Sequence, residues 1–467
     1  MNTIKKEKTL LIFLVAFVLR LTVFLLFRPW DIQVQTESIF VGDAPGYHTL
    51  AECIASYFTF CGDTFRTPGY PFFIAIFYAF FGAKPWVVLF AQILADLVTI
   101  YYVLKIGEMI FSRRVGIIAA TFLAINPNSI FQTTSLYSDS LFVTFLSACL
   151  YFYLRGLKLG EGRSFLIAGG LLAIATLVRP VAQYYFLILF FFALLWPTRN
   201  LVTRLKWGLL YALAFTITIS PWLYRNYTLY DTIKLSSVQG ETLLFWQVGY
   251  IRGWETHQPR KTVATEFKSQ AQALGYSESS NPFANEAIAQ KLAVQYIKTH
   301  TLVFASRWIN GMINTYTNLG TADIANKLGF TRTELPPDAF VNEKGFKLIS
   351  LFFKTKSLPE IAAGLIVLGW LLMNYSMFLL GAYVLIRRHQ WAIFSLFVVS
   401  IAFFTVPGGP MGLARYRLPC EPFYFLVGAF YIDQFLNRRF EVAARVDKPS
   451  LQADKKNPIG WLKTQQT

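Results

Sequence analysis

The chain has 467 residues, of which 55% are hydrophobic and only 15% charged, and its mean hydropathy is +0.44. This composition excludes an ordinary soluble globular protein and indicates an all-α polytopic membrane protein, because a spanning helix satisfies its own backbone groups in lipid. The net charge of +17 does not indicate nucleic-acid binding. Most of the positive excess lies in short loops and in the C-terminal tail, as the positive-inside rule expects.

The first apolar segment covers residues 10–27 and follows three lysines at positions 5, 6 and 8. It predicts a retained membrane anchor with a cytoplasmic N-terminus. An outer loop over residues 29–85 comes next and carries the motif G-D-A-P-G-Y-H at 42–48 and the motif R-T-P-G-Y-P at 66–71. Cys53 and Cys61 share this loop, and the sequence leaves open whether they form a disulfide.

Whether the apolar stretch 68–82 crosses the membrane decides on which side of the membrane every later loop lies. It is only about fifteen residues long and begins with two prolines, so we expect it to lie along the outer surface rather than to cross. The Lys/Arg clusters that follow later spans then all fall in the cytoplasm, as the positive-inside rule favours. We therefore predict about ten transmembrane helices plus juxtamembrane helices in the first outer loop.

The later spans follow in chain order and divide the chain into four regions. We expect them near residues 86–111, 115–131, 139–154, 165–178, 181–196, 205–221, 359–386, 391–407 and 419–436. Residues 1–222 then form an N-terminal transmembrane catalytic module, and residues 223–358 form an outer, periplasmic loop region. Residues 359–437 hold the C-terminal transmembrane helices, and the charged tail 438–467 is expected to be disordered in the cytoplasm.

Charged residues collect at the predicted outer ends of the helices. Arginine is disfavoured on that side, and several guanidinium groups together suit a lipid phosphate, which they bind in a planar, two-pronged way. A carboxylate beside them can accept the proton of an acceptor hydroxyl. The candidates are Asp43 and Asp139 as catalytic groups, Arg66, Arg179, Arg225, Arg415 and Arg417 for a donor phosphate, and Tyr47, His48, Tyr70 and Tyr416 for the substrate.

Simpler roles stay open for these residues. An arginine at a helix end also reaches toward phospholipid headgroups without forming a site. Asp139 suits a helix N-cap, and Asp43 suits a turn ahead of Pro45.

Several of these motifs follow a known order. The chain carries Asp43, R-T-P-G-Y-P-F-F-I-A, Y-S-D-S-L-F with Asp139, L-V-R-P with Arg179, S-P-W-L-Y-R-N-Y with Arg225, and A-R-Y-R-L-P-C-E-P-F. In this order it resembles the GT-C superfamily of integral-membrane glycosyltransferases, in the bacterial branch of the protein O-mannosyltransferases and the lipid A aminoarabinose transferase.

The resemblance implies a polyprenyl-phosphate sugar donor and an inverting transfer on the outer face to a glycan, lipid or protein acceptor. It places Asp43 as the base and Arg66 where relatives carry a donor-binding lysine. Asp43 stands alone where the mannosyltransferases have an Asp-Glu pair, so a protein acceptor is not favoured over the others. Dependence on a divalent metal varies in the superfamily and stays open.

Two other functions remain alternatives. A transporter or flippase for a lipid-linked anionic glycan would carry charges at mid-depth in several helices, and Asp96 and Lys105 are the clearest examples. A non-catalytic subunit of a glycan-assembly complex would tolerate the loss of Asp43. For the enzyme we expect a multi-pass protein of a bacterial inner membrane, with the site facing the periplasm, both termini in the cytoplasm and membrane lipids as neighbours.

Overall fold

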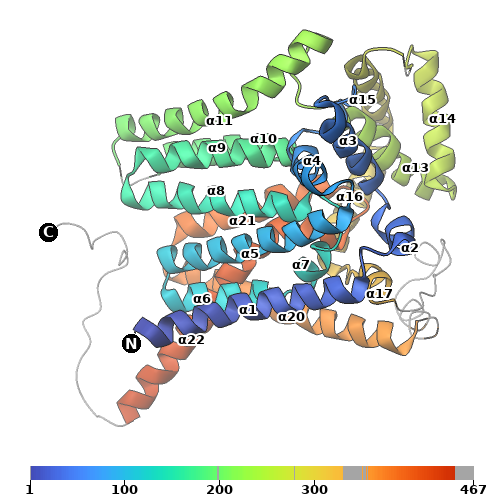
Figure 1. The fold of residues 1–467 in the computed structure, drawn as a ribbon. Helices are drawn as coiled ribbons and strands as arrows, with labels where there is room; N and C mark the ends of the chain where they lie inside the picture. The colour runs from blue at the N-terminus through green and yellow to red at the C-terminus, as the bar shows by residue number, and fades with distance from the viewer. Residues whose placement is uncertain are drawn as a thin grey trace.

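The computed structural model describes residues 2–196, 199–277, 279–329 and 356–446, together with residues 350 and 354. Within these residues every regular element is helical, and the long helices run side by side in one bundle (Figure 1). The N-terminus of α1 and the C-terminal end of α22 lie at the same end of this bundle. The sequence-based prediction of an all-α polytopic membrane protein is confirmed.

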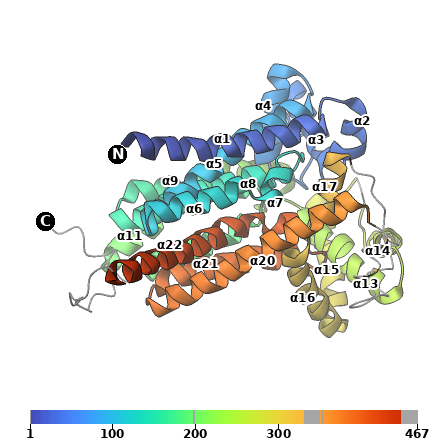
Figure 2. The ribbon, with the colours of Figure 1, turned by 90° about the horizontal axis from the view of Figure 1, so that it is seen from below.

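Six of the described helices are long and apolar enough to cross a membrane. Three shorter apolar helices and α22 (Glu421–Val446) pack among them (Figure 2). The long ones are α1 (Asn2–Phe27), α5 (Pro85–Ile110), α8 (Asp139–Leu159), α11 (Leu201–Tyr230), α20 (Leu358–Arg387) and α21 (Trp391–Thr405). The shorter ones are α4 (Gly69–Phe81), α9 (Gly162–Val178) and α10 (Ala182–Leu194). The count of about ten spans stays a prediction.

Three helices end elsewhere than the sequence patterns indicate. The single span expected over 115–131 is divided into α6 (Arg113–Ala124) and α7 (Pro127–Gln132), because Pro127 has no N–H to donate and starts a new helix. Helix α11 continues through Pro221, and α22 runs on to Val446 because residues 437–446 hold no glycine or proline. Helix therefore replaces the expected disorder over 438–446, and residues 447–467 lie outside the described residues.

A buried ion pair holds the break between α6 and α7. The Arg20 Nε atom donates to the Asp96 carboxylate at 2.6 Å, and the two side chains are 0% and 7% exposed. The Arg20 guanidinium also donates to the carbonyl of Ala124, the last residue of α6, at 2.8 Å. Because the last carbonyls of a helix have no partner inside it, Arg20 satisfies an otherwise unpaired group there. The sequence analysis singled out Asp96 but missed Arg20.

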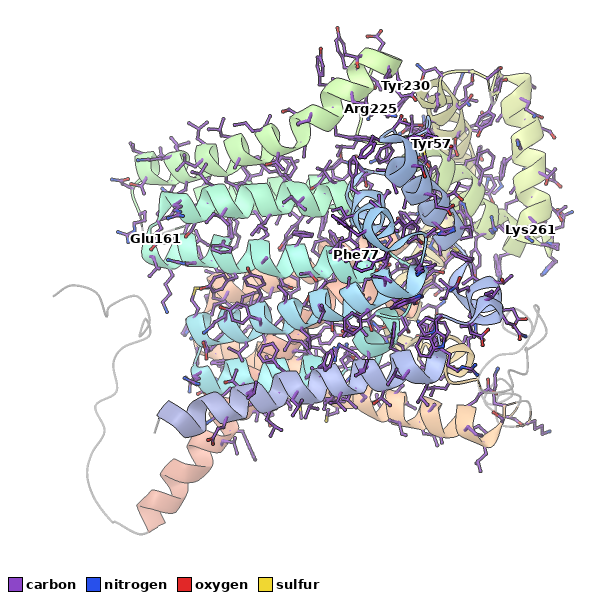
Figure 3. The ribbon with its side chains drawn as sticks, viewed as in Figure 1. Tyr57, Phe77, Glu161, Arg225, Tyr230 and Lys261 are labelled. Carbon is purple, nitrogen blue, oxygen red and sulfur yellow. A yellow bond between two sulfur atoms is a disulfide. The ribbon has the colours of Figure 1, made fainter. Side chains whose placement is uncertain are left out.

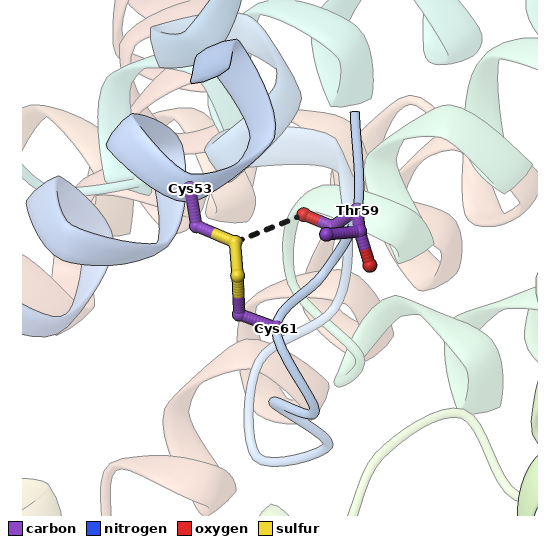
Figure 4. Close-up of a disulfide and its surroundings, with 3 residues drawn as sticks. All are labelled: Cys53, Thr59 and Cys61. Carbon is purple, nitrogen blue, oxygen red and sulfur yellow. Dashed lines mark hydrogen bonds between the residues drawn. A yellow bond between two sulfur atoms is a disulfide. The ribbon is translucent and has the colours of Figure 1, made fainter. Parts of the chain in front are cut away.

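The first outer loop folds into short helices at one end of the bundle: α2 (Ile32–Val34), η1 (Gln35–Ile39), α3 (Ala44–Tyr57) and α4. In both views α3 and α4 lie across that end and do not follow the long helices (Figures 1 and 2). Cys53 and Cys61 form a disulfide with their Cα atoms 6.4 Å apart, which closes the turn after α3 (Figure 4). The question that the sequence left open is thereby answered.

The outer loop region is a helical subdomain at the same end of the bundle (Figure 1). It consists of α12 (Val238–Glu241), η2 (Thr242–Val248), α13 (Gly249–Thr256), α14 (Arg260–Ala273), α15 (Pro282–Thr299), α16 (Thr301–Thr317) and α17 (Thr321–Leu328). Helices η2, α13, α14 and α15 share a hydrophobic core of their own, formed by Leu244, Val248, Ile251, Val263, Phe267, Ala289, Ala293 and Tyr296.

Candidate active site

Residues far apart in the sequence form an ion pair at the rim of the bundle. Asp43 directly precedes α3, and Arg415 lies in the short 3-10 helix η4 (Ala414–Cys420). The Asp43 Oδ2 atom lies 3.1 Å from a terminal nitrogen of Arg415. The Asp43 side chain is 49% exposed and that of Arg415 only 18%. The guanidinium is therefore held in place, while part of the carboxylate is free to meet a ligand.

Tyr137 joins the segments that carry this pair. Its hydroxyl donates to the Val41 carbonyl at 3.1 Å, and the Arg415 guanidinium lies over its ring, 4.5 Å from the centroid. Gly42 has φ +60°, and a Cβ atom there would lie 2.8 Å from the Tyr137 hydroxyl. Tyr137 lies in the motif around Asp139 but was not among the site residues predicted from the sequence. The sequence signal that could have identified it is an aromatic residue two positions before Asp139.

Arg66 lies directly against the start of α3. Its guanidinium pairs with Asp63 at 3.1 Å and covers the Tyr47 ring at 5.2 Å. Gly46 makes this possible, because a Cβ atom at that position would lie 2.0 Å from an Arg66 nitrogen. The Tyr47 hydroxyl donates to Ser138 at 3.4 Å. Arg66 and Tyr47 thus join the same rim as Tyr137, and Asp63 holds Arg66 there.

Arg179 and Asp139 form a second ion pair at this rim. Asp139 begins α8 and is 3% exposed, whereas Arg179 follows the last residue of α9 and is 26% exposed. Burial lowers the pKa of Arg179, and repulsion from Arg415 lowers it further. Asp43 and Tyr47 act on it in the opposite direction. Arg179 therefore lies within electrostatic reach of the Asp43–Arg415 pair, and Asp139 orients Arg179.

Two of the predicted phosphate ligands lie elsewhere. Arg417 is 1% exposed, and its guanidinium donates to the carbonyls of Asn318 and Thr315 while its Nε atom lies 3.5 Å from Glu421. It fastens the end of α16 to η4. Arg225 lies near the outer end of α11, close to Tyr230 (Figure 3). Its guanidinium covers the ring of Trp222 at 4.7 Å and also contacts two other aromatic rings.

Of the residues predicted to bind the substrate, some lie at the rim and others are buried beneath it. Tyr416 stays beside Arg415, whose guanidinium is 5.2 Å from its ring. Tyr70 is buried, donates to Gln92 at 2.6 Å and packs edge-on against Tyr47, so it supports the site without facing a ligand.

His48 points away from the rim ion pairs. Its Nδ1 atom lies 2.7 Å from the Tyr78 hydroxyl, and its ring packs against Phe40. Burial lowers the pKa of His48, and Glu52 opposes this shift. The imidazole is therefore mainly neutral at pH 7. A neutral imidazole suits a hydrogen-bonding role better than a role that requires the protonated, charged form.

No group of three or more His, Cys, Asp or Glu side chains that could hold a metal ion occurs in the described part of the chain. Asp43 is accompanied by arginines rather than by further carboxylates. These residues do not form the all-oxygen ligand set that a divalent cation prefers.

Comparison with known proteins gives one family match and several structural ones. Residues 66–224 match the family model for dolichyl-phosphate-mannose-protein mannosyltransferase. No curated protein sequence matches the chain. The fold is similar to that of the archaeal oligosaccharyltransferase AglB from Archaeoglobus fulgidus, in complex with an inhibitory peptide and a dolichol-phosphate. The TM-score is 0.50 at 13% identity, over 98% of this chain and 54% of the AglB chain.

A second similar structure is ArnT from Cupriavidus metallidurans in the apo state. It aligns at a TM-score of 0.40 and 14% identity, over 96% of this chain and 81% of that chain. The family match extends from Arg66 through Arg179 into α11, and the AglB fold accounts for nearly the whole chain. The chain shares the fold of AglB, and its residues 66–224 resemble the mannosyltransferase family. The chain spans about half the length of AglB, 54% of that chain, so the likeness establishes its fold and not its activity.

The rim of the bundle combines one reachable carboxylate with an excess of fixed positive charge. Arg415, Arg179 and Arg66 converge there, and each is only partly exposed. Guanidinium groups that are held in place by other residues do not have to reorganise when an anion arrives. The arrangement can therefore bind a phosphate group and keep a carboxylate beside it.

Proposed function

We propose that this protein transfers a sugar from a polyprenyl-phosphate donor to an acceptor on the outer face of the membrane. The observation that carries the proposal is the half-exposed Asp43 carboxylate, paired with Arg415 within reach of Arg179. The matching family model names a dolichyl-phosphate sugar donor, and the AglB structure holds a dolichol-phosphate. In a bacterium the outer face is the periplasmic side of the inner membrane, and both termini lie in the cytoplasm.

Asp43 is the general base of this reaction. Its carboxylate accepts the proton of the acceptor hydroxyl while the hydroxyl oxygen bonds to the anomeric carbon of the donor sugar. The bond between that carbon and the phosphate oxygen breaks, and its electron pair leaves with the polyprenyl phosphate. Attack opposite to the leaving phosphate inverts the anomeric configuration. A positioned base of this kind contributes about 10²–10⁴-fold to a rate.

The arginines stabilise the leaving group. Negative charge grows on the phosphate as the glycosidic bond breaks, and preorganised donors aimed at developing charge are effective where water is excluded. Arg415 and Arg179 are the best placed, because their mutual repulsion is relieved by an anion between them. Arg66 and Tyr47 form the neighbouring wall, and Tyr416 offers a ring on the other side of Arg415. The acceptor class stays open among glycan, lipid and protein.

The transporter alternative receives less support from the interior of the bundle. It requires charged groups at mid-depth that a cargo can reach. Asp96 is paired with Arg20 and receives a further hydrogen bond from Ser129 at 2.9 Å, and both charged side chains are nearly or fully buried. A buried, paired charge of this kind stabilises helix packing, and a cargo cannot reach it.

The test is the release of polyprenyl phosphate by the full-length protein in lipid nanodiscs supplied with polyprenyl-phosphate sugars and candidate acceptors. Asp43→Asn keeps the shape of the side chain and removes the base, so release should fall by at least about 100-fold. Asp31→Asn, a change to a carboxylate that pairs with Arg28 in the same loop, is the matched control and should leave the rate unchanged. Full turnover by Asp43→Asn would exclude Asp43 as the base.

A further inference from the structure

The outer subdomain carries two arginines stacked face-on upon tryptophan rings. The Arg260 guanidinium lies 3.8 Å from the ring centroid of Trp246, and that of Arg307 lies 3.5 Å from the ring centroid of Trp254. Both tryptophans belong to the continuous helical stretch of η2 and α13, while the arginines come from α14 and α16. These four residues are named the Trp–Arg surface.

Two glycines of α13 lie beside Arg260. A Cβ atom at Gly249 would lie 3.7 Å from the Arg260 side-chain Cγ, and one at Gly253 would lie 3.7 Å from the Arg260 Cα. From this position the Arg260 side chain reaches the ring of Trp246. Such a stack is stabilised by the attraction between the cation and the electron-rich ring face.

Neither guanidinium is neutralised by a carboxylate among the described residues. The one hydrogen bond found for Arg260 is to the Phe245 carbonyl at 3.4 Å, and the buried Arg307 Nε atom has no hydrogen-bond partner. Arg252 in the same subdomain behaves differently, because it pairs with Glu266 at 3.1 Å. The terminal guanidinium nitrogens of Arg260 and Arg307, which no described carboxylate neutralises, can therefore pair with an external anion.

Exposed aromatic rings lie next to these donors. Trp246 is 41% exposed and Tyr250 is 39% exposed. Trp246, Tyr250 and Trp254 recur every four residues, so their side chains follow one side of the helical stretch. A flat ring packs against the apolar face of a sugar, and a stacked arginine binds a carboxylate or phosphate on that sugar.

The position of the surface favours a water-soluble glycan over membrane lipid. Figure 1 shows α13 and α14 at the outermost end of the molecule, beyond α3 and α4, and Figure 3 shows Lys261 of α14 at that edge. Trp308 of α16 donates to the Val406 carbonyl at 2.9 Å. Because residues 406–420 continue into η4, the surface is attached to the segment that carries Arg415.

We propose that the Trp–Arg surface binds the glycan of an acidic acceptor, one that carries carboxylate or phosphate groups, and presents it to the rim site. This inference rests on the proposed function and specifies its acceptor class. The stacked indoles contact the sugar rings, and Arg260 and Arg307 pair with the acidic groups.

The experiment measures binding directly. Full-length protein in neutral lipid nanodiscs is titrated with tetragalacturonate and with the neutral maltotetraose, following tryptophan fluorescence and heat. We expect tetragalacturonate to bind at least about tenfold more tightly than maltotetraose. Arg260→Ala and Arg307→Ala should each weaken binding of tetragalacturonate about tenfold, whereas Arg252→Ala, which removes the same charge from the same subdomain, should not. Arg307→Lys keeps the charge but loses the planar stack, and it should also weaken binding.

Every outcome decides the proposal. Equal binding by the wild type and the two alanine variants overturns it, as does the absence of tetragalacturonate binding. Competition by nanodiscs that contain phosphatidylglycerol would show that lipid headgroups occupy the surface, and would also overturn it. The binding titration needs no donor and is therefore independent of the release assay. Binding of tetragalacturonate by a protein that releases no polyprenyl phosphate would exclude the proposed transfer reaction but would still support the Trp–Arg surface as a binding site.

Discussion

At the scale of single residues, each rim group acts through the neighbour that holds it. Asp43 is oriented by Arg415, and Arg415 lies on the ring of Tyr137. Asp139, which the sequence suggested as a second catalytic carboxylate, is buried and paired with Arg179. A buried carboxylate that fixes an arginine is a positioning group, so its removal should affect donor binding before it affects proton transfer.

Tyr137→Phe tests this positioning. The substitution removes the hydroxyl that donates to the Val41 carbonyl and keeps the ring beneath Arg415. One net hydrogen bond contributes about 1 kcal/mol, so we expect kcat to fall about fivefold while the KM for the donor changes little. The measurement is steady-state release of polyprenyl phosphate, with the melting temperature as the check on folding. A lower melting temperature with unchanged kcat would make Tyr137 purely structural.

At the scale of elements, the outer helices fix the loops that carry the site. The disulfide between Cys53 and Cys61 closes the turn that follows α3. Helix α17 docks on the end of α7 and on the loop between α7 and α8, because Lys327 donates to the Phe131 carbonyl of α7 and to Ser135 of the loop. Since Tyr137 belongs to this loop, α17 contributes to the rim without reaching it.

Lys327 makes the docking of α17 dependent on pH. Burial lowers the pKa of Lys327 from its ordinary 10.5 to about 8, with Asp323 opposing the shift. Between pH 8 and 10.5 the unfolded chain therefore binds more protons at this residue than the folded one, so stability rises with pH in that window and is constant below it. Lys327→Met should remove this slope. The measurement compares the melting temperatures of both proteins from pH 6 to about 10; parallel curves would refute the assignment.

At the scale of the whole molecule, the bundle has one end for the site and one for the termini. Asp43, Arg66 and the outer subdomain belong to the end that bears α3 and α4, whereas the turn at Glu161 lies at the opposite end (Figures 1 and 3). The Arg20–Asp96 pair ties α1 to α5 within the bundle. The orientation of this bundle in a membrane follows from the positive-inside rule and stays a prediction.

Labelling of single cysteines tests the orientation. Ala83 is exposed between α4 and α5, and a membrane-impermeant maleimide should react with Ala83→Cys in intact cells. Glu161→Cys at the other end should react only after the membrane is permeabilised. The native cysteines give little background, because Cys149 and Cys420 are buried and the other two form the disulfide. The reverse pattern would show that α4 crosses and inverts the topology of everything after it, and equal access of both sites from outside would show an even number of crossings between them.

Periodicity and length predicted most of the helices but not their breaks. The apolar runs that became α5, α8 and α20 were evident because lipid-facing and buried helix faces are both apolar. The division at Pro127 has a local signal in the proline itself, but the partner that satisfies the end of α6, Arg20, lies far away in the sequence. The same limit applied to the arginines: their positions near helix ends were evident from the sequence, but burial within η4 separated Arg417 from its neighbour Arg415.

The sequence by itself determined the class of the molecule, because hydropathy and the distribution of Lys and Arg are properties of segments and do not depend on long-range contacts. It also indicated Asp43 and a group of rim arginines through their order along the chain. Only the tertiary structure decided which of them meet. Asp43 and Arg415 are separated by 372 positions, and Arg179 reaches them through a different helix end. Such convergence depends on how the helices pack, which no local pattern records.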